Sequence, residues 1–226
     1  KVAVFARREA GEPAAPKDWD DRELPAPTIR TVVAAIEGVD AFAERLKSEA
    51  DRLGVTASGG ATVLGDGAPW IWNLAETVLP QAEGLLDVYH AAEHIAAAAR
   101  AVWGEGTARA AAGLEEGRSA LIAEGLRGLE SWISRVFEEV GTGVGYDELI
   151  SLAAYATSHT TRLNYAERLG DGRSIGSGLI EGTIKQLVNL RLKRTGARWC
   201  AENVGPLVEL IALADTPEWQ SLWTAL

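Results

Sequence analysis

The sequence contains no methionine, a single cysteine and no apolar run close to the roughly 20 residues that cross a bilayer. Cys200 alone excludes an internal disulfide framework and any zinc cluster built on cysteines. The first residues, KVAVFARREA, lack the basic, apolar and small-residue regions of a signal peptide. We therefore expect a cytoplasmic protein without a membrane partner. Because an initiator methionine is also missing, we expect an amino-terminal piece to be absent.

Positive charge is scarce over most of the chain and concentrated near its carboxyl end. The formal net charge of −10 argues against binding nucleic acid through overall charge. Residues 1–161 carry 14 basic and 25 acidic side chains, whereas residues 162–200 carry 8 and 3. Residues 201–226 carry no basic and four acidic side chains. The basic stretch KQLVNLRLKRTGARW is therefore the one candidate for contact with an anionic partner.

The first 90 residues alternate between strand and helix patterns. Half of the eight prolines fall between residues 9 and 28, which predicts a long loop between two strands that form a hairpin. The expected order is strand 1–7, strand 28–36, helix 38–53, strand 61–66, helix 69–80 and strand 84–90. The segment ATVLGD is continuously apolar up to its acid, as in a strand buried on both faces. This order predicts an α/β fold with a mixed sheet.

After residue 90 the composition becomes rich in Ala, Leu, Glu and Arg, which is typical of helices. We expect a helical insertion over residues 91–172. The stretch SGLIEGTIKQLVNLRLKRTG predicts one helix that begins near Ser177, ends at Gly196 and carries Glu181 in its early turns. The expected organisation is thus a core in 1–90, the helical insertion in 91–172, and helices in 173–226 that complete the core.

Three acids occupy sequence positions that favour a metal site. Asp66 and Asp87 end two predicted strands, and Glu181 lies on the late helix. Carboxylates from such positions favour Mg²⁺ or Mn²⁺, because hard oxygen ligands suit these ions. Two such ions can activate the attacking oxygen and stabilise the leaving oxygen in phosphodiester cleavage or strand transfer. Cations that follow Glu181 would then hold the flanking DNA backbone.

A competing pattern lies in the same region. HAAEH, residues 90–94, fits the H-x-x-E-H signature of inverted zinc peptidases. In that alternative His90 and His94 bind zinc and Glu93 activates water. The third ligand would come from a distant helix, with Glu167 or Glu181 as candidates.

Two blocks of the sequence resemble the DDE transposases of bacterial insertion sequences of the Kra type, which are relatives of the Mutator-like superfamily. The blocks are VLGDGAPWIWNLAETVLPQAEGLLDVYHAAEHI and RLNYAERLGDGRSIGSGLIEGTIKQLVNLRLKRTGARW. The resemblance implies an RNase H-like mixed sheet with a large all-α insertion before the final catalytic helix. It implies Mg²⁺-dependent (or Mn²⁺-dependent) DNA cleavage and strand transfer, with transposon ends and target DNA as partners and a homo-oligomer on DNA.

The resemblance also assigns residues. Asp66 corresponds to the second acid of the DDE triad and Glu181 to the third, both as metal ligands. Asp87 and His90 match the Cys/Asp-x-x-His pattern that follows the second acid and would shape the site or position DNA. The family pattern is recognisable at Tyr155, Arg162, Asn164, Tyr165, Ser177, Gly178, Lys185, Arg191, Lys193, Gly196 and Trp199. The candidates for DNA contact are Lys185, Arg191, Lys193, Arg194, Arg198 and Trp199, with Lys185 and Arg191 foremost.

One departure from the family is serious. The first acid of the triad lies on a strand that should precede KVAVFAR. Asp18, Asp20 and Asp21 lie in the proline-rich loop and are poor substitutes. We therefore expect this polypeptide alone to be weakly active or inactive. A non-catalytic remnant of a transposase is the remaining alternative.

Overall fold

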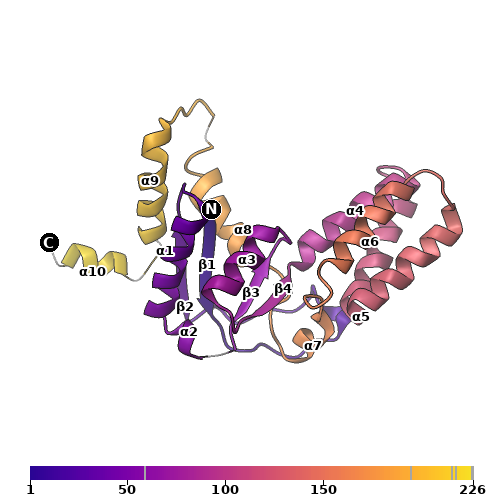
Figure 1. Ribbon diagram of the computed structural model, residues 1–226, viewed down its shortest axis with the longest axis horizontal. Helices are drawn as coiled ribbons and strands as arrows, with labels where there is room; N and C mark the ends of the chain where they lie inside the picture. Colours follow the sequence, from indigo (N-terminus) through magenta and orange to yellow (C-terminus); the bar gives the residue numbers. More distant parts are fainter. Residues whose placement is uncertain (59, 194, 215, 217, 225–226) are drawn as a thin grey trace.

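A computed structural model describes residues 1–226 except 59, 194, 215, 217 and 225–226. It is mixed α/β and predominantly helical, with the strands at the centre (Figure 1). A helical arm, residues 88–157, lies on one side of the strands, and the carboxyl-terminal helices lie on the other. The elements of the first half are β1 (Val2–Arg7), η1 (Pro16–Asp18), β2 (Ile29–Ala34), α1 (Val39–Arg52), α2 (Val55–Ser58), β3 (Thr62–Gly65), α3 (Pro69–Val78) and β4 (Glu83–Leu86). The remainder are α4 (Val88–Trp103), α5 (Ala108–Val140), α6 (Tyr146–Thr157), α7 (Tyr165–Gly170), α8 (Gly178–Ile184), η2 (Lys185–Asn189), α9 (Ala201–Ala214) and α10 (Glu218–Thr224). None of the described helices combines the length and the apolar character needed to cross a membrane.

The strands form two separate pairs. β1 and β2 are antiparallel, with Val2 opposite Ala34 and Arg7 opposite Ile29, and the proline-rich loop joins them as predicted. β3 and β4 are parallel, with Thr62 opposite Glu83. Among the described residues no ladder of hydrogen bonds joins the two pairs. The expected single mixed sheet is therefore present only as two halves.

Helix α3 makes the crossover that the parallel pair β3–β4 requires. Pro69 occupies its first turn, where a missing N–H costs nothing. A Cβ on Gly65 would lie 2.9 Å from Cγ2 of Ile71, so the absence of a side chain lets α3 pack across the end of β3. β3 is only partly buried except at Gly65, which corrects the prediction of a strand buried on both faces. Its second edge has no partner strand in the described chain.

The prediction of a strand over residues 84–90 is wrong in its second half. β4 ends at Leu86, and the helix α4 begins at Val88 instead of continuing as a strand to His90. Asp87 caps this helix, because its carboxylate accepts the backbone N–H of Tyr89 at 3.1 Å. The cap outweighs the β-propensity of Val88 and Tyr89, so His90 lies in the first turn of a helix.

The late basic helix is also shorter than predicted. α8 ends at Ile184 and continues into the π-helical turn η2, where the N–H of Leu190 donates to the carbonyl of Lys185. Leu187 is buried there against Val32 of β2 and Val208 of α9. The chain leaves helical structure before Gly196, whose φ of +80° is of the kind glycine adopts freely.

Apolar side chains form three clusters. The largest joins β4 to the helical arm and includes Leu86, Ile95, Leu121 and Trp132. A second lies between α1 and α3, and a third between β2, η2 and α9. Close packing of α4 on α5 depends on a glycine, because a Cβ on Gly117 would lie 2.7 Å from Cγ2 of Ile95.

Replacing Gly117 by alanine should therefore destabilise the protein by about 1–3 kcal/mol through overpacking. The matched control is Gly182→Ala, since Gly182 lies in α8 with open space around its Cα. That variant should gain about 0.5–1 kcal/mol from its better helix propensity. Urea unfolding of both variants checks the prediction, and equal stabilities would contradict the packing account.

Candidate functional site

Asp66 and Asp87 directly follow the parallel strands β3 and β4, so they share the carboxyl edge of this strand pair. This edge is where α/β proteins commonly bind ligands. The Asp66 side chain is exposed and accepts the N–H of Ala68 at 2.9 Å. Gly67, with φ +97°, completes the tight turn. Asp66 is thus held in one conformation while its carboxylate stays open to solvent.

The turn at Asp66 packs against aromatic side chains at the carboxyl end of α6 and just after it. The hydroxyl of Tyr155 donates to the carbonyl oxygen of Asp66 at 3.3 Å. A Cβ on Gly67 would lie 2.9 Å from Nε2 of His159 and 3.0 Å from the Tyr155 hydroxyl. Glycine is therefore required here both for the positive φ and for space. Burial, followed by the charges of Asp66 and Asp87, raises the pKa of Tyr155, so its hydroxyl stays a donor.

Asp87 joins this edge to the late helix α8. Its carboxylate is buried, and besides Tyr89 it accepts the backbone N–H of Ser177 at 3.3 Å and the Ser177 hydroxyl. Ser177 immediately precedes α8. The neighbouring backbone adds a further bond, from the N–H of Val88 to the carbonyl of Ile175 at 3.1 Å. Two segments 90 positions apart are thereby held together, and both oxygens of Asp87 are occupied by protein donors.

Glu181 lies on α8, in the first turn after this junction. Its side chain is exposed and makes no hydrogen bond or ion pair with the described residues. The helix is further fixed to the hairpin β1–β2, because Arg30 donates to the Thr183 hydroxyl at 2.7 Å. Burial, followed by the charges of Asp20, Asp87 and Glu181, raises the pKa of Tyr89. Asp87 and Glu181 therefore both act on the same tyrosine hydroxyl.

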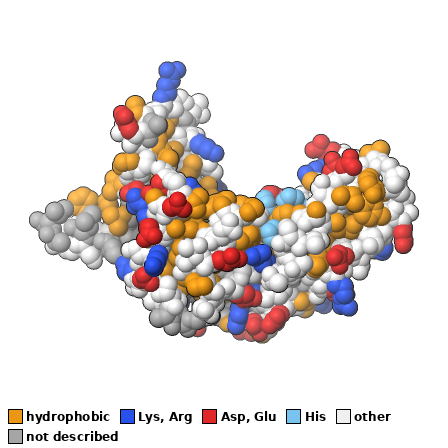
Figure 2. Space-filling view, viewed as in Figure 1, with side chains coloured by type: hydrophobic (Ala, Val, Ile, Leu, Met, Phe, Trp, Pro, Cys, Tyr) orange, Lys and Arg blue, Asp and Glu red, His pale blue; other side chains and the backbone are white. Residues whose placement is uncertain are grey.

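All three histidines of the chain gather around Tyr155, in the hollow between the strands and the helical arm (Figure 2). The His94 ring stacks on Tyr155 with centroids 3.9 Å apart, and His90 meets His94 edge to face at 5.2 Å. His159 is buried and its Nδ1 has no partner among the described residues. Nδ1 of His90 lies 3.3 Å from the Glu93 carboxylate. His90, predicted as a site residue, is thus one member of an aromatic cluster beside Asp66.

The described residues contain no group of three His, Cys, Asp or Glu side chains close enough to hold a metal ion. The zinc peptidase alternative needs such a group, because His90 and His94 require a third ligand. Neither Glu167 nor Glu181 supplies one in this structure. Asp66, Asp87 and Glu181 do not form such a group either, so the predicted convergence of these three carboxylates on one metal ion is absent from the described residues. The resemblance assigns only Asp66 and Glu181 as metal ligands.

Comparison of the chain with protein-family models, with curated proteins and with solved structures finds no match.

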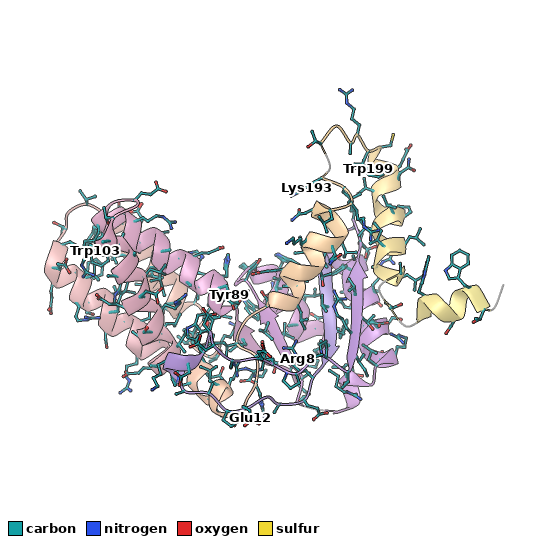
Figure 3. All side chains as sticks on the ribbon, turned by 180° about the vertical axis from the view of Figure 1, so that it is seen from behind. Arg8, Glu12, Tyr89, Trp103, Lys193 and Trp199 are labelled. Carbon is teal, nitrogen blue, oxygen red and sulfur yellow. The ribbon has the colours of Figure 1, made fainter. Side chains whose placement is uncertain are left out.

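The predicted DNA-contact residues lie on and after η2. Lys185, Arg191, Lys193 and Arg198 are in a row of largely exposed positions, whereas Arg194 lies outside the described residues. Trp199 is 46% exposed and its Nε1 donates to the carbonyl of Leu192 at 2.9 Å, so it is not a core residue. Lys193 and Trp199 both project from the upper end of this segment (Figure 3). These exposed cations are available to bind an anionic partner.

The segment RLNYAER, residues 162–168, serves the strands rather than a ligand. Arg168 is buried and donates to the Glu83 carboxylate at 2.6 Å and to the Thr62 hydroxyl at 3.1 Å. Tyr165 donates to the carbonyl of Leu86 at 3.0 Å, and the guanidinium of Arg162 lies over the ring of Trp72 at 4.4 Å. This packing was not predicted, since nothing in the sequence pairs Glu83 with a residue 85 positions away. Tyr89 and His159 were also missed as neighbours of the site.

Replacing Arg168 by methionine should destabilise the protein by about 2–3 kcal/mol, because Glu83 loses its charged partner while remaining partly buried. The control is Arg127→Met, whose side chain is 81% exposed and pairs with Glu124 at 3.1 Å. That change should cost less than about 0.5 kcal/mol. Urea unfolding measures both, and a neutral Arg168→Met would contradict a structural role for the ion pair.

Lowering the pH from about 7.5 to about 5.5 should reduce stability through two of the histidines. Burial and the charge of His90 lower the pKa of His94, and burial with Arg162 and the other histidines lowers the pKa of His159. The unfolded chain, in which histidine titrates near 6.5, therefore takes up protons first. The stabilisation is full above that pH and is lost as the pH falls through the folded-state pKa.

The unfolding free energy of the wild type should thus fall over this range more steeply than that of His94→Gln or His159→Gln. Urea titrations at a series of pH values make the comparison. Identical slopes for the three proteins would show that neither histidine is held neutral by the fold.

Proposed function

We propose that the chain is the carboxyl-terminal part of a DDE transposase catalytic domain, with Asp66 and Glu181 as two of its three metal-binding acids. The supporting observation is the contact between Asp87 and Ser177, which holds the helix of Glu181 at the strand edge that ends in Asp66. Asp87 is then a positioning residue, because both of its carboxylate oxygens already accept hydrogen bonds from Tyr89 and Ser177. His90 lies beside it in the first turn of α4.

Asp66 and Glu181 are chemically suited to a divalent ion. Both are exposed, and neither takes part in an ion pair with the described residues. Their hard carboxylate oxygens favour Mg²⁺ or Mn²⁺. When bound, such an ion would activate the attacking oxygen and neutralise charge on the scissile phosphate. The chain's own contribution is to hold the two carboxylates on rigid elements and to leave them unpaired.

The first acid would lie on a strand between the two strand pairs. Lys1 and Ala35 exchange both backbone hydrogen bonds, so alternate residues Val2, Val4 and Ala6 direct their backbone groups away from β2. Along β3, Ala61 and Gly65 accept from β4, which leaves Thr62 and Leu64 facing the other edge. β1 and β3 are the inner strands of the two pairs in Figure 1. A strand from outside the described residues that pairs with both edges would join the halves into one mixed sheet, as an RNase H-like fold requires.

The cations after Glu181 complete the proposal. Lys185, Arg191, Lys193 and Arg198 would contact the phosphates that flank the scissile bond, and Trp199 would stack on a base or sugar. Binding should therefore weaken steeply with salt. Since two transposon ends have to be brought together, we expect the active form to be an oligomer on DNA.

The direct test is cleavage of the insertion-sequence ends by the full-length protein. Asp66→Asn and Glu181→Gln should each reduce the rate by more than about a hundredfold, because loss of a ligand exceeds the 10–100-fold effect of residues behind the ligands. The control is Glu138→Gln, an exposed acid on α5. It should cleave at the wild-type rate. Wild-type cleavage by Glu181→Gln would rule out the catalytic role of that residue.

A further inference from the structure

Two arginines of the proline-rich loop carry N–H groups that none of the described residues satisfies. Arg8 directly follows β1, and Arg22 lies near the far end of the loop. Nη2 of Arg22 donates to the carbonyl of Arg173. Nη1 of Arg22 and Nε of Arg8 are buried and have no hydrogen-bond partner among the described residues. Buried donors of this kind are rare and point to an acceptor supplied from outside.

The loop that carries these arginines is fixed to the body of the protein. The N–H of Gly11 donates to the carbonyl of Gly172, and that of Ala14 to the carbonyl of Leu169, each at 2.9 Å. A Cβ on Gly172 would lie 2.0 Å from the carbonyl oxygen of Gly11, and Gly172 has φ +68°. The loop therefore packs backbone against backbone on the connection between α7 and α8. This contact fixes the backbone of the loop between Arg8 and Arg22.

Arg22 lies within electrostatic range of two other arginines, Arg168 and Arg8. Burial lowers the pKa of Arg22, and the charges of Arg168 and Arg8 lower it further. The carboxylate of Glu83 already pairs with Arg168, and Arg173 lies 3.6 Å from Asp171. Within the described part of the chain, no carboxylate forms an ion pair with Arg8 or Arg22. An anion would supply both the missing charge and the missing acceptor oxygens.

Tyr89 adds a third donor beside the arginines. Tyr89 lies within electrostatic range of Arg22, and the residue is 42% exposed. The ring packs on Trp19, with centroids 5.6 Å apart, and against Gly176, where a Cβ would lie 2.6 Å from Cε2. Burial and the acids Asp20, Asp87 and Glu181 raise its pKa, which keeps the hydroxyl protonated.

We propose that Arg8 and Arg22, with Tyr89 beside them, form a binding site for a phosphate group. Arginine suits phosphate because its planar guanidinium presents several N–H donors to the oxygens at once. The most direct source is a backbone phosphate of DNA, an assignment that rests on the proposed function. One DNA strand would then be held at two places, by this site in the proline-rich loop and by the cations after Glu181.

The site itself is tested with inorganic phosphate and does not depend on catalysis. Nitrogen-15 NMR of the arginine Nε–H groups should show a saturable shift for Arg8 and Arg22 as phosphate is added. Arg8→Met should weaken phosphate binding at least tenfold, and Arg22→Lys, which retains a charge but loses the planar fork, should weaken it as well. Arg127→Met is the control and should bind like the wild type. Absence of a saturable shift, or equal affinity in all variants, would overturn the site.

A folding defect is separated from a binding defect by the choice of variants. Arg8→Met removes no hydrogen bond seen in the described residues, so its melting temperature should equal that of the wild type without phosphate. Added phosphate should raise the melting temperature of the wild type and leave that of Arg8→Met unchanged. An equal rise in both proteins would overturn the proposal.

The source of the phosphate is tested with a short DNA oligonucleotide. Arg8→Met should weaken DNA binding at all sequences alike and reduce the slope of log affinity against log salt by about 1. Loss of phosphate binding with unchanged DNA binding would assign the site to a free phosphate and overturn the DNA source. That result is distinguishable from failure of the proposed function, which is read from end cleavage by Glu181→Gln.

Discussion

The contact between the buried carboxylate of Asp87 and Ser177 is the constraint on which the candidate site depends. Asp87 caps α4 through Tyr89 and holds the start of α8 through two donors of Ser177. Hydrogen bonds to a charged group contribute about 1.5–3 kcal/mol each, and removal of one partner would leave a buried charge unsatisfied. One side chain therefore fixes the direction of two helices that the chain separates by 90 residues. The position of Glu181 relative to the strand edge follows from this contact.

Charge is separated around that junction. Exposed acids lie at the strand edge and on α8, unpaired arginines lie in the proline-rich loop, and exposed cations lie on and after η2. Histidines that burial keeps neutral line the hollow next to Asp66. An acidic protein with separate basic surfaces can hold metal and phosphate together without neutralising its own carboxylates. This separation is a physical basis for our proposal of phosphoryl transfer on DNA.

Local patterns were sufficient for the hairpin β1–β2, for α1 and for the unit β3–α3–β4. Proline content, helical periodicity and an apolar run ending in Asp66 each specify their element without distant contacts. The end of β4 was mispredicted because a capping carboxylate competes with two residues of high β-propensity. The basic helix was predicted too long, since the π-helical turn arises from burial of Leu187 against β2 and α9. The pairing of Arg168 with Glu83 and the unsatisfied arginines of the loop depend on tertiary packing, which no sequence spacing encodes.

We propose that Asp66 and Glu181 share one divalent ion because Asp87 holds α8 in place. A crystal structure of the protein grown with Mn²⁺ tests it most directly, because the anomalous signal locates the ion without assumptions about chemistry. The account predicts one Mn²⁺ peak with oxygens of both carboxylates at about 2.1 Å, and loss of that peak in Glu181→Gln crystals. A Mn²⁺ ion bound away from Asp66, or Asp66 and Glu181 side chains too far apart to reach one ion, would contradict it.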